Sequence, residues 1–339
     1  MTARSRHYPS AMPRVTPFDP PLRPAPFTAC GAGLGPSAAE PCPCGSQRLS
    51  ADCHFDPQTS RWQLPPVDPL LSGPITGSSI HGCYAALTSD CKGKLSNEHW
   101  ISKGVLVDAS DGKRVRIGGL PWQPEGGIDH LPPSTLGSNI LCERHNNSLS
   151  PLDAHAAHAF KVMDDFYIDQ IGKNDLGGNH IDLVHGEHLE RWLLKMIWGA
   201  TAAFPTVPPI RSDIDRTMLA QYLFRDGPLP TDWGLYTKGL QQGRKSNPEQ
   251  TLTVGLENID GELWGGSVVV GGVELYFSFG SLTGHRGATV AHRPSALFLD
   301  RTGSANCKVV ALSWDQETTQ LARGVRITYD PAIGTSPIQ

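Results

Sequence analysis

The chain has 339 residues and a formal net charge of −4, and it contains 36 glycines and 29 prolines. This length is enough for two or three domains, and the high glycine and proline content favours loops and short strands over long helices. The acidic balance gives no sign of the basic face that is typical of nucleic-acid-binding proteins. The sequence contains no run of about 18 apolar residues, so no membrane-spanning helix is predicted.

The N-terminal segment, residues 1–40, is dense in proline and is predicted to be disordered. It carries arginines but lacks the apolar stretch of a secretory signal, so we expect a cytoplasmic protein. In that reducing compartment, the eight cysteines of the chain indicate metal binding rather than disulfides.

A first cluster of metal-binding residue types lies within residues 41–56. Zinc takes four nitrogen or sulfur ligands in a tetrahedron. A Cys-Pro-Cys-Gly-Ser turn followed by an adjacent Cys-His pair offers these four ligands: Cys42, Cys44, Cys53 and His54. The spacing closely resembles the SEC-C zinc motif. That resemblance implies a structural zinc ion in a small knuckle that contacts a partner or substrate, and it implies no catalysis.

A second set of four candidate zinc ligands follows: Cys83, Cys91, Cys142 and His145. Cys142 and His145 stand three residues apart at the start of a helix predicted to run to about Gln170, so both side chains can reach one ion. Such an ion would tie the helix to the strands that precede it. The wide spacing of the first two cysteines leaves His81 as an alternative ligand to Cys83.

Candidate catalytic groups lie between these ligands. Glu98 and His99 are predicted near the end of a short strand, and Asn146 directly follows a zinc ligand. A carboxylate and a carboxamide oxygen suit Mg²⁺ or Mn²⁺, and a histidine beside them can act as a general base on water. The cation would stabilise the charge that develops on a scissile phosphate.

Residues 83–153 resemble the HNH (ββα-metal) nuclease family. The resemblance is carried by the Glu98-His99 pair, the Asn139-Ile-Leu-Cys142 step and the Cys142-x2-His145-Asn146-Asn147 segment.

The HNH resemblance implies a role for each matching residue. His99 corresponds to the general base, and Glu98 and Asn146 correspond to ligands of a catalytic divalent cation. Asn139 corresponds to the residue that braces the loop holding the base. Cleavage would give a 5′-phosphate and a 3′-hydroxyl.

The long insert between His99 and Asn139 is predicted to contain a β-hairpin formed by residues 105–108 and 113–117. Three basic residues of this hairpin are candidates for phosphate contacts, although a solvated charged strand is the simpler interpretation: Lys113, Arg114 and Arg116.

The remaining sequence predicts helices at 188–203 and 213–223, followed from residue 251 by strands separated by glycine-rich turns. We expect a small antiparallel β unit there. The predicted fold is therefore α+β. It combines a zinc-stapled ββα nuclease domain at 80–172 with a helical and β-rich C-terminal domain of unassigned role at 185–339.

The favoured function is a metal-dependent endonuclease acting on DNA, with two structural Zn²⁺ ions and a catalytic Mg²⁺ or Mn²⁺. Restriction or antiviral defence is the role associated with this type of architecture. One alternative is a non-catalytic zinc-knuckle protein that binds nucleic acid or a protein partner, which the missing basic bias favours. Another is the same site acting on RNA, because ribose recognition depends on side chains that the sequence does not place.

Overall fold

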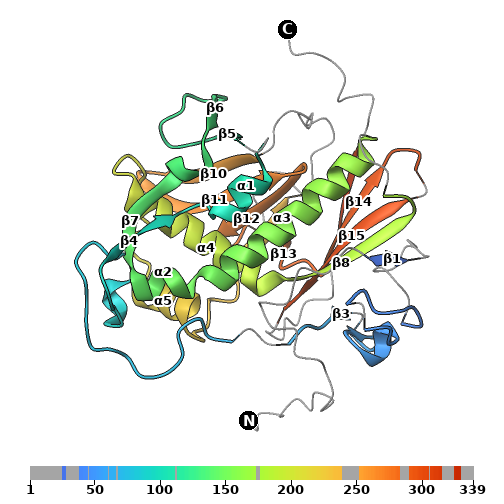
Figure 1. The fold of residues 1–339 in the computed structure, drawn as a ribbon, viewed down its shortest axis with the longest axis horizontal. Coiled ribbons are helices and arrows are strands. Elements are labelled where there is room, and N and C mark those ends of the chain that lie inside the picture. The colour runs from blue at the N-terminus through green and yellow to red at the C-terminus, as the bar shows by residue number, and fades with distance from the viewer. Residues whose placement is uncertain are drawn as a thin grey trace.

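The computed structural model has a mixed α and β fold, which confirms the coarse fold class (Figure 1). Except for residues 25–27 and 38–40, the segment predicted to be disordered lies outside the described residues. The structure describes residues 25–27, 38–44, 46–59, 61–65, 68–110, 113–172, 176–238, 252–282, 290–304, 306–314 and 324–329.

The helix predicted from Cys142 to about Gln170 is present as two helices that meet at Leu149, and the helices predicted near 188–203 and 213–223 are present. A proline in the first turn begins α3, and the Asp215 carboxylate caps α5 by accepting a hydrogen bond from the Thr217 N–H at 2.8 Å. The helices of the described residues are α1 (Lys103–Asp108), α2 (Glu143–Ser148), α3 (Ser150–Gln170), α4 (Gly186–Ala203) and α5 (Arg216–Phe224), with 3-10 turns η1 (Ser50–Asp52), η2 (Ala86–Thr88) and η3 (Pro133–Leu136).

A five-stranded mixed sheet lies at the right of Figure 1. Its parallel pairs are β8 with β15 and β14 with β16, and its other pairs are antiparallel. Helix α3 packs against this sheet. The strand order is β1 (Ala25–Phe27), β8 (Asn179–His185), β15 (Cys307–Ser313), β14 (Ala296–Arg301) and β16 (Gly324–Tyr329).

A seven-stranded sheet joins the middle of the chain to its C-terminal part. The parallel pair β5–β10 makes that connection, since Ile117 lies opposite Leu252. The prediction of one small antiparallel unit is therefore wrong, because strand partners are set by long-range packing that turn signals do not encode. The order is β13 (Val290–His292), β9 (Gly234–Lys238), β12 (Val273–Ser278), β11 (Glu262–Val270), β10 (Leu252–Ile259), β5 (Val115–Gly118) and β6 (Ile128–Leu131).

Two further strands, β4 (Leu95–His99) and β7 (Gly137–Cys142), form a separate antiparallel pair that runs directly into α2. A bulge in β7 opposite the Ser96–Asn97 step shifts the register. The chain therefore contains two antiparallel strands, with α1, β5, β6 and η3 between them in sequence, and helix α2 follows the second strand.

The hairpin predicted within the insert is wrong, because residues 103–108 form helix α1. Val105 and Leu106 are buried against the rest of the core while Val107 is 48% exposed, so burial follows a helical turn and not the alternation of a strand. Packing of α1 on α3 overrides the strand propensity of the two valines.

Helix α4 runs through the interior, and every residue from Gly186 to Ala200 is buried. It contacts α3, α5 and strands of both large sheets and of the β4–β7 pair. The predicted helix is confirmed, but its charged residues face other parts of the protein and not solvent.

Glu190 shows how these buried charges are accommodated. Its carboxylate accepts two hydrogen bonds from the Arg293 guanidinium at 2.8 and 2.9 Å and one from the Leu235 N–H at 2.7 Å, and the Tyr222 hydroxyl also donates to it. Gly234 is required beside it, because its φ is +122° and a Cβ there would lie 2.2 Å from Glu190 Oε2.

One hydrophobic core cluster extends from Leu71 to Tyr329 and includes residues of α3, α4 and both halves of the seven-stranded sheet. The boundary predicted between 172 and 185 lies inside this shared core.

We predict that a chain ending at residue 185 does not fold. The truncation removes α4 and exposes the buried faces of α3 and β7, which share a core with it. Circular dichroism and solubility measurements should reveal an unfolded or aggregated fragment. A soluble fragment that melts cooperatively would contradict the shared core.

Candidate functional site

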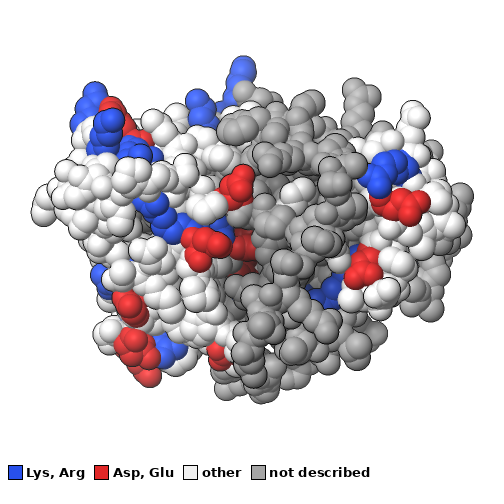
Figure 2. Space-filling model, turned by 90° about the horizontal axis from the view of Figure 1, so that it is seen from below, with Lys and Arg blue, Asp and Glu red and all other residues white. Residues whose placement is uncertain are grey.

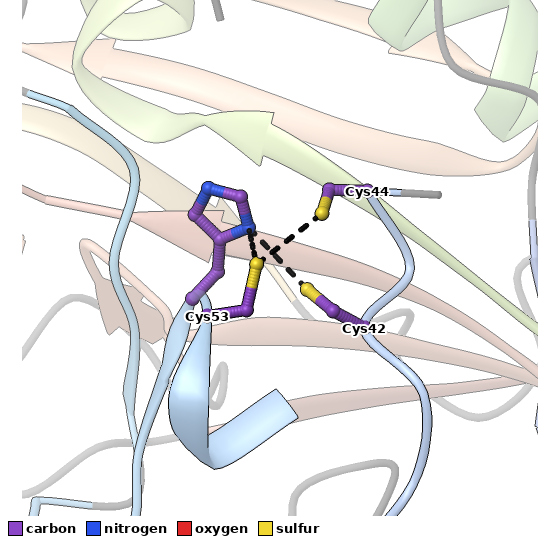
Figure 3. A group of neighbouring side chains, drawn as sticks. Cys42, Cys44 and Cys53 are labelled. Carbon is purple, nitrogen blue, oxygen red and sulfur yellow. Dashed lines mark hydrogen bonds between the residues drawn. The ribbon is translucent and has the colours of Figure 1, made fainter. Parts of the chain in front are cut away.

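The first set of predicted zinc ligands comes together in the structure, and we call it the knuckle cluster (Cys42, Cys44, Cys53 and His54). The sulfur atoms of Cys42 and Cys53 lie 3.3 and 3.4 Å from His54 Nδ1, and those of Cys44 and Cys53 lie 3.4 Å apart (Figure 3). A backbone bridge between Pro41 and Leu49 closes the turn that carries the first two cysteines.

The knuckle cluster packs on the five-stranded sheet of its own chain. Cys42, Cys53 and Trp62 form one buried apolar cluster with residues of β8, β14 and β15, including Ile181 and Phe298. One face of the knuckle is therefore committed to the fold.

The second set also converges, and we call it the helix cluster (Cys83, Cys91, Cys142 and His145). His145 Nδ1 lies 3.7, 3.9 and 3.1 Å from the sulfur atoms of Cys83, Cys91 and Cys142. His81 is exposed and is not part of the group, so Cys83 is the member that the structure favours.

His145 is held in the form that a metal ion requires. Its Nε2 lies 3.1 Å from Thr88 Oγ1, whose own proton is donated to the Ala85 carbonyl, so Nε2 carries the hydrogen and Nδ1 is free to bind. Burial, assisted by Arg144 and Arg225, lowers the pKa of His145 to about 4, so the ring is neutral at pH 7.

Both clusters suit zinc. Tetrahedral Zn–S bonds of about 2.3 Å separate two ligand sulfurs by roughly 3.8 Å, close to the spacing of the donor atoms here. Burial raises the pKa of Cys83 to about 12, so its thiolate needs a cation beside it. Among the described residues, these are the groups that bring three or more such donors within 4.8 Å of one another.

A buried ion-pair network supports the helix cluster. Asp90 accepts two hydrogen bonds from Arg144 at 3.0 and 3.2 Å and one from the Thr76 N–H at 3.0 Å, and Arg225 at the end of α5 also pairs with it. Burial acts to raise the pKa of Asp90, but Arg144, the Thr76 N–H and Arg225 lower it below its usual value. The loop that carries Cys91 is thereby fixed to α2 and α5.

Glu98 and His99 lie on opposite faces of β4, because successive side chains of a strand alternate. Glu98 is 3% exposed and faces α4, whereas His99 is half-buried and lies on the same face as Asn97, opposite Gly137 of β7.

The Glu98 carboxylate is paired with Lys195 of α4 at 2.5 Å. The same ammonium donates to Asp153 of α3 at 3.0 Å and to the His99 carbonyl at 2.6 Å. Burial acts to lower the pKa of Lys195, but the two carboxylates offset this effect and raise it, so the side chain remains charged. Ser102 completes the network by accepting from Trp192 Nε1 at 2.5 Å and donating to Asp153.

The His99 imidazole has a nitrogen without a hydrogen-bond partner among the described residues. This nitrogen is Nε2, which is buried. Burial, followed by the positive charges of Lys195 and Lys103, lowers the pKa of His99, and Asp153 opposes them. The ring is therefore neutral and basic at neutral pH.

Asn146 braces β4 from α2. Its amide nitrogen donates to Ser96 Oγ at 2.9 Å and to the Asn97 carbonyl at 3.4 Å, which leaves its oxygen without a bond to any described residue. Asn139 lies opposite Asn97 in the strand pair and is exposed. These two predicted site residues lie close to β4, while Glu98 faces away from His99.

Lys195 and Asp153 are the site residues that sequence reasoning missed. Lys195 is 96 positions from the His99 carbonyl that it binds, and it lies on a helix interpreted from periodicity alone. Buried charges at helical spacing are indistinguishable in sequence from a solvated face.

Charged side chains of both signs are interspersed over the described atoms of the face in Figure 2, without a broad basic area. Lys113 and Arg114 are exposed and Arg116 is half-buried on and before β5. Within the described residues, no helix has the length and apolar character needed to span a membrane.

Comparisons with protein-family models, curated protein sequences and solved structures give no match. The function is therefore argued from the geometry of the two clusters and of β4.

Cys307 lies outside both clusters and is disulfide-bonded, whereas the six other described cysteines are free. The expectation that the cysteines bind metal rather than form disulfides is therefore wrong for Cys307, because spacing in the sequence does not show which cysteines the fold brings together.

We predict two zinc ions per chain. Eight donors in two groups of four, each with its atoms within 4.8 Å, correspond to one ion each. Metal analysis of purified protein kept free of chelators should return about two equivalents. A folded protein with less than about half an equivalent would contradict both sites.

We further predict that Cys142→Ser and Cys44→Ser differ. Each should remove one zinc equivalent, but Cys142 joins β7 to α2 within the main core, so its loss should abolish the cooperative melt. Cys44→Ser affects a cluster packed on one sheet face and should leave the main melt in place. Equal melting behaviour of the two variants would contradict this assignment.

Proposed function

We propose that this chain is a nuclease that hydrolyses phosphodiester bonds in DNA, with His99 as the general base. The proposal is supported by the order β4–β7–α2, by a zinc-binding group at the start of α2, and by the HNH resemblance of residues 83–153. It is carried above all by one observation: the His99 ring is half-buried, neutral and has an unpartnered nitrogen.

In the proposed reaction, His99 accepts a proton from water and the resulting hydroxide attacks the phosphorus. The bond between phosphorus and the 3′ oxygen breaks as the new bond to hydroxide forms. The 3′ oxygen takes a proton from solvent water and His99 releases its proton to solvent, which gives the 5′-phosphate and 3′-hydroxyl products that the resemblance implies. Asn146 and the β4–β7 pairing keep the strand that bears the base in place.

The resemblance also implies a divalent cation held by Glu98 and Asn146. The donor set does not fit that role, because the Glu98 carboxylate is paired with Lys195 on the other face of β4. Asn146 Oδ1 alone is a weak ligand set for Mg²⁺, which prefers carboxylates. No step of the proposed reaction is therefore assigned to a cation at Glu98.

A non-catalytic zinc-knuckle protein is the second candidate function. The net charge of −4 and the interspersed surface charges favour it. An RNA substrate would use the same base and is distinguished by offering both nucleic acids in one assay.

We predict that His99→Ala abolishes plasmid nicking. Loss of a general base typically costs about 100- to 10,000-fold in rate. The zinc content and melting temperature should stay close to those of the parent, because the ring makes no hydrogen bond to a described residue.

The matched control is His130→Ala, since His130 is an exposed histidine on β6. It should cleave like the parent in the same buffers, with Mg²⁺, with Mn²⁺ and without added metal. A parent that binds DNA but cleaves neither DNA nor RNA in any of these buffers supports the second candidate instead.

The acid side of the pH–rate profile gives an independent prediction. Because the pKa of His99 lies below its ordinary value of 6.5, the neutral base persists at neutral pH and is lost only as the pH falls through that lower value. The kcat/KM of cleavage should be level near pH 7 and fall with a midpoint below 6.5. A midpoint above 7 would exclude His99 as this base.

A further inference from the structure

Four oxygen atoms surround the Lys195 ammonium. Glu98 Oε1, the His99 carbonyl, Asp153 Oδ1 and Ser102 Oγ lie 2.5, 2.6, 3.0 and 3.5 Å from Nζ. They come from β4, the segment before α1, and α3, and they include two carboxylates. Carboxylate, carbonyl and hydroxyl oxygens in this number are the donors of a cation site.

We propose that Lys195 is the resident cation of this site, and that Glu98 and Lys195 are positioning residues for His99 rather than parts of a divalent-metal centre. The positioning role rests on the proposed nuclease function, whereas the identity of the cation does not.

Lys195 occupies this site from the protein interior. Its side chain is fully buried on α4, while the side chain of its partner Asp153 is 30% exposed. A divalent ion would have to displace a charge that already has two carboxylate partners. The pKa of Lys195, raised by these carboxylates, agrees with a charged side chain.

The same ammonium fixes the base through its backbone. The hydrogen bond from Nζ to the His99 carbonyl holds the residue that bears the imidazole, and Glu98 holds Nζ from the adjacent residue. Helix α4 thereby sets the position of a group on a strand 96 residues earlier in the chain.

The test measures Mn²⁺ binding to the zinc-loaded, full-length protein by the electron paramagnetic resonance signal of free Mn²⁺. The variants are E98Q, K195M and the double variant K195M/E98Q. E98Q should change any Mn²⁺ dissociation constant of the parent by less than about 3-fold, because Glu98 is no ligand, whereas loss of a true ligand or its support typically costs about 10- to 100-fold.

K195M should gain one Mn²⁺ equivalent that the parent lacks. In this variant the carboxylates, carbonyl and hydroxyl that surround the ammonium in the parent are left without a cation. The double variant should lose that gain. If K195M does not fold without metal, added Mn²⁺ should restore its cooperative melt, and the E98Q measurement decides independently. A parent site that E98Q weakens 10-fold or more, or a K195M protein that folds and gains no Mn²⁺, would overturn the proposal.

The catalytic consequence is read separately. E98Q should lower kcat at least about 10-fold with KM for DNA unchanged, and raising Mn²⁺ should not rescue it, since no metal ligand was removed. If the parent cleaves nothing, the nuclease proposal fails while the Mn²⁺ measurements still decide the identity of the cation. If high Mn²⁺ restores E98Q to the parent rate, the positioning role is wrong.

Discussion

The burial of charge on helix α4 is the constraint on which much of the structure depends. An isolated ion in a protein interior is so unfavourable that each buried charge must meet partners wherever the chain can supply them. Glu190 binds Arg293 and the backbone of β9 to the helix, and Lys195 forms ion pairs with carboxylates of β4 and α3. Removing one partner of such a pair typically costs about 3–5 kcal/mol, because the other charge is left unpaired. These pairs therefore fix which elements lie beside α4, while the surrounding leucines and tryptophans supply the apolar burial.

The two Cys₃His clusters act on different scales. The helix cluster brings together segments around positions 83, 91 and 142–145, and the Asp90 network fastens it to α5. The knuckle cluster joins only the short turn that carries Cys42 and Cys44 to the adjacent pair Cys53 and His54. It packs on a sheet formed by β8, β14 and β15. Structural zinc contributes on the order of 10 kcal/mol or more to small folds. Zinc binding should therefore determine whether the fold around the helix cluster forms, whereas at the knuckle cluster it should stabilise only the local turn.

Short-range chemistry is what the sequence predicts well here. The spacing of Cys142 and His145 at the start of a helix foretold a shared ligand group, and apolar periodicity located α4 and α5. Long-range pairing was not predictable in the same way. Val105 to Asp108 carries strand-forming residues but is helical because α3 offers a packing surface, and β5 joins β10 across more than a hundred residues. Lys195 was given no role in the sequence analysis, since nothing local distinguishes a buried lysine from a solvated one. The orientation of Glu98 was missed although strand alternation predicts it, because the family resemblance assigned both members of the Glu-His pair to one site.

Because side chains alternate along β4, the adjacent residues Glu98 and His99 lie in different surroundings. The Glu98 side of β4 faces an interior of fixed charges, where a carboxylate is useful as a counter-ion and inaccessible to a phosphate. The His99 side carries a half-buried neutral imidazole and the exposed Asn97 and Asn139 side chains. The interior network still reaches the outer face through the backbone, because Lys195 binds the carbonyl of His99 itself. Under the proposed function, a change at Glu98 therefore reaches His99 through Lys195 and the backbone of β4, because the two side chains share no ligand. In this geometry the two residues of the Glu-His pair cannot share one site. The alternation of β4 places Glu98 in the interior beside Lys195 and His99 on the opposite face of the strand.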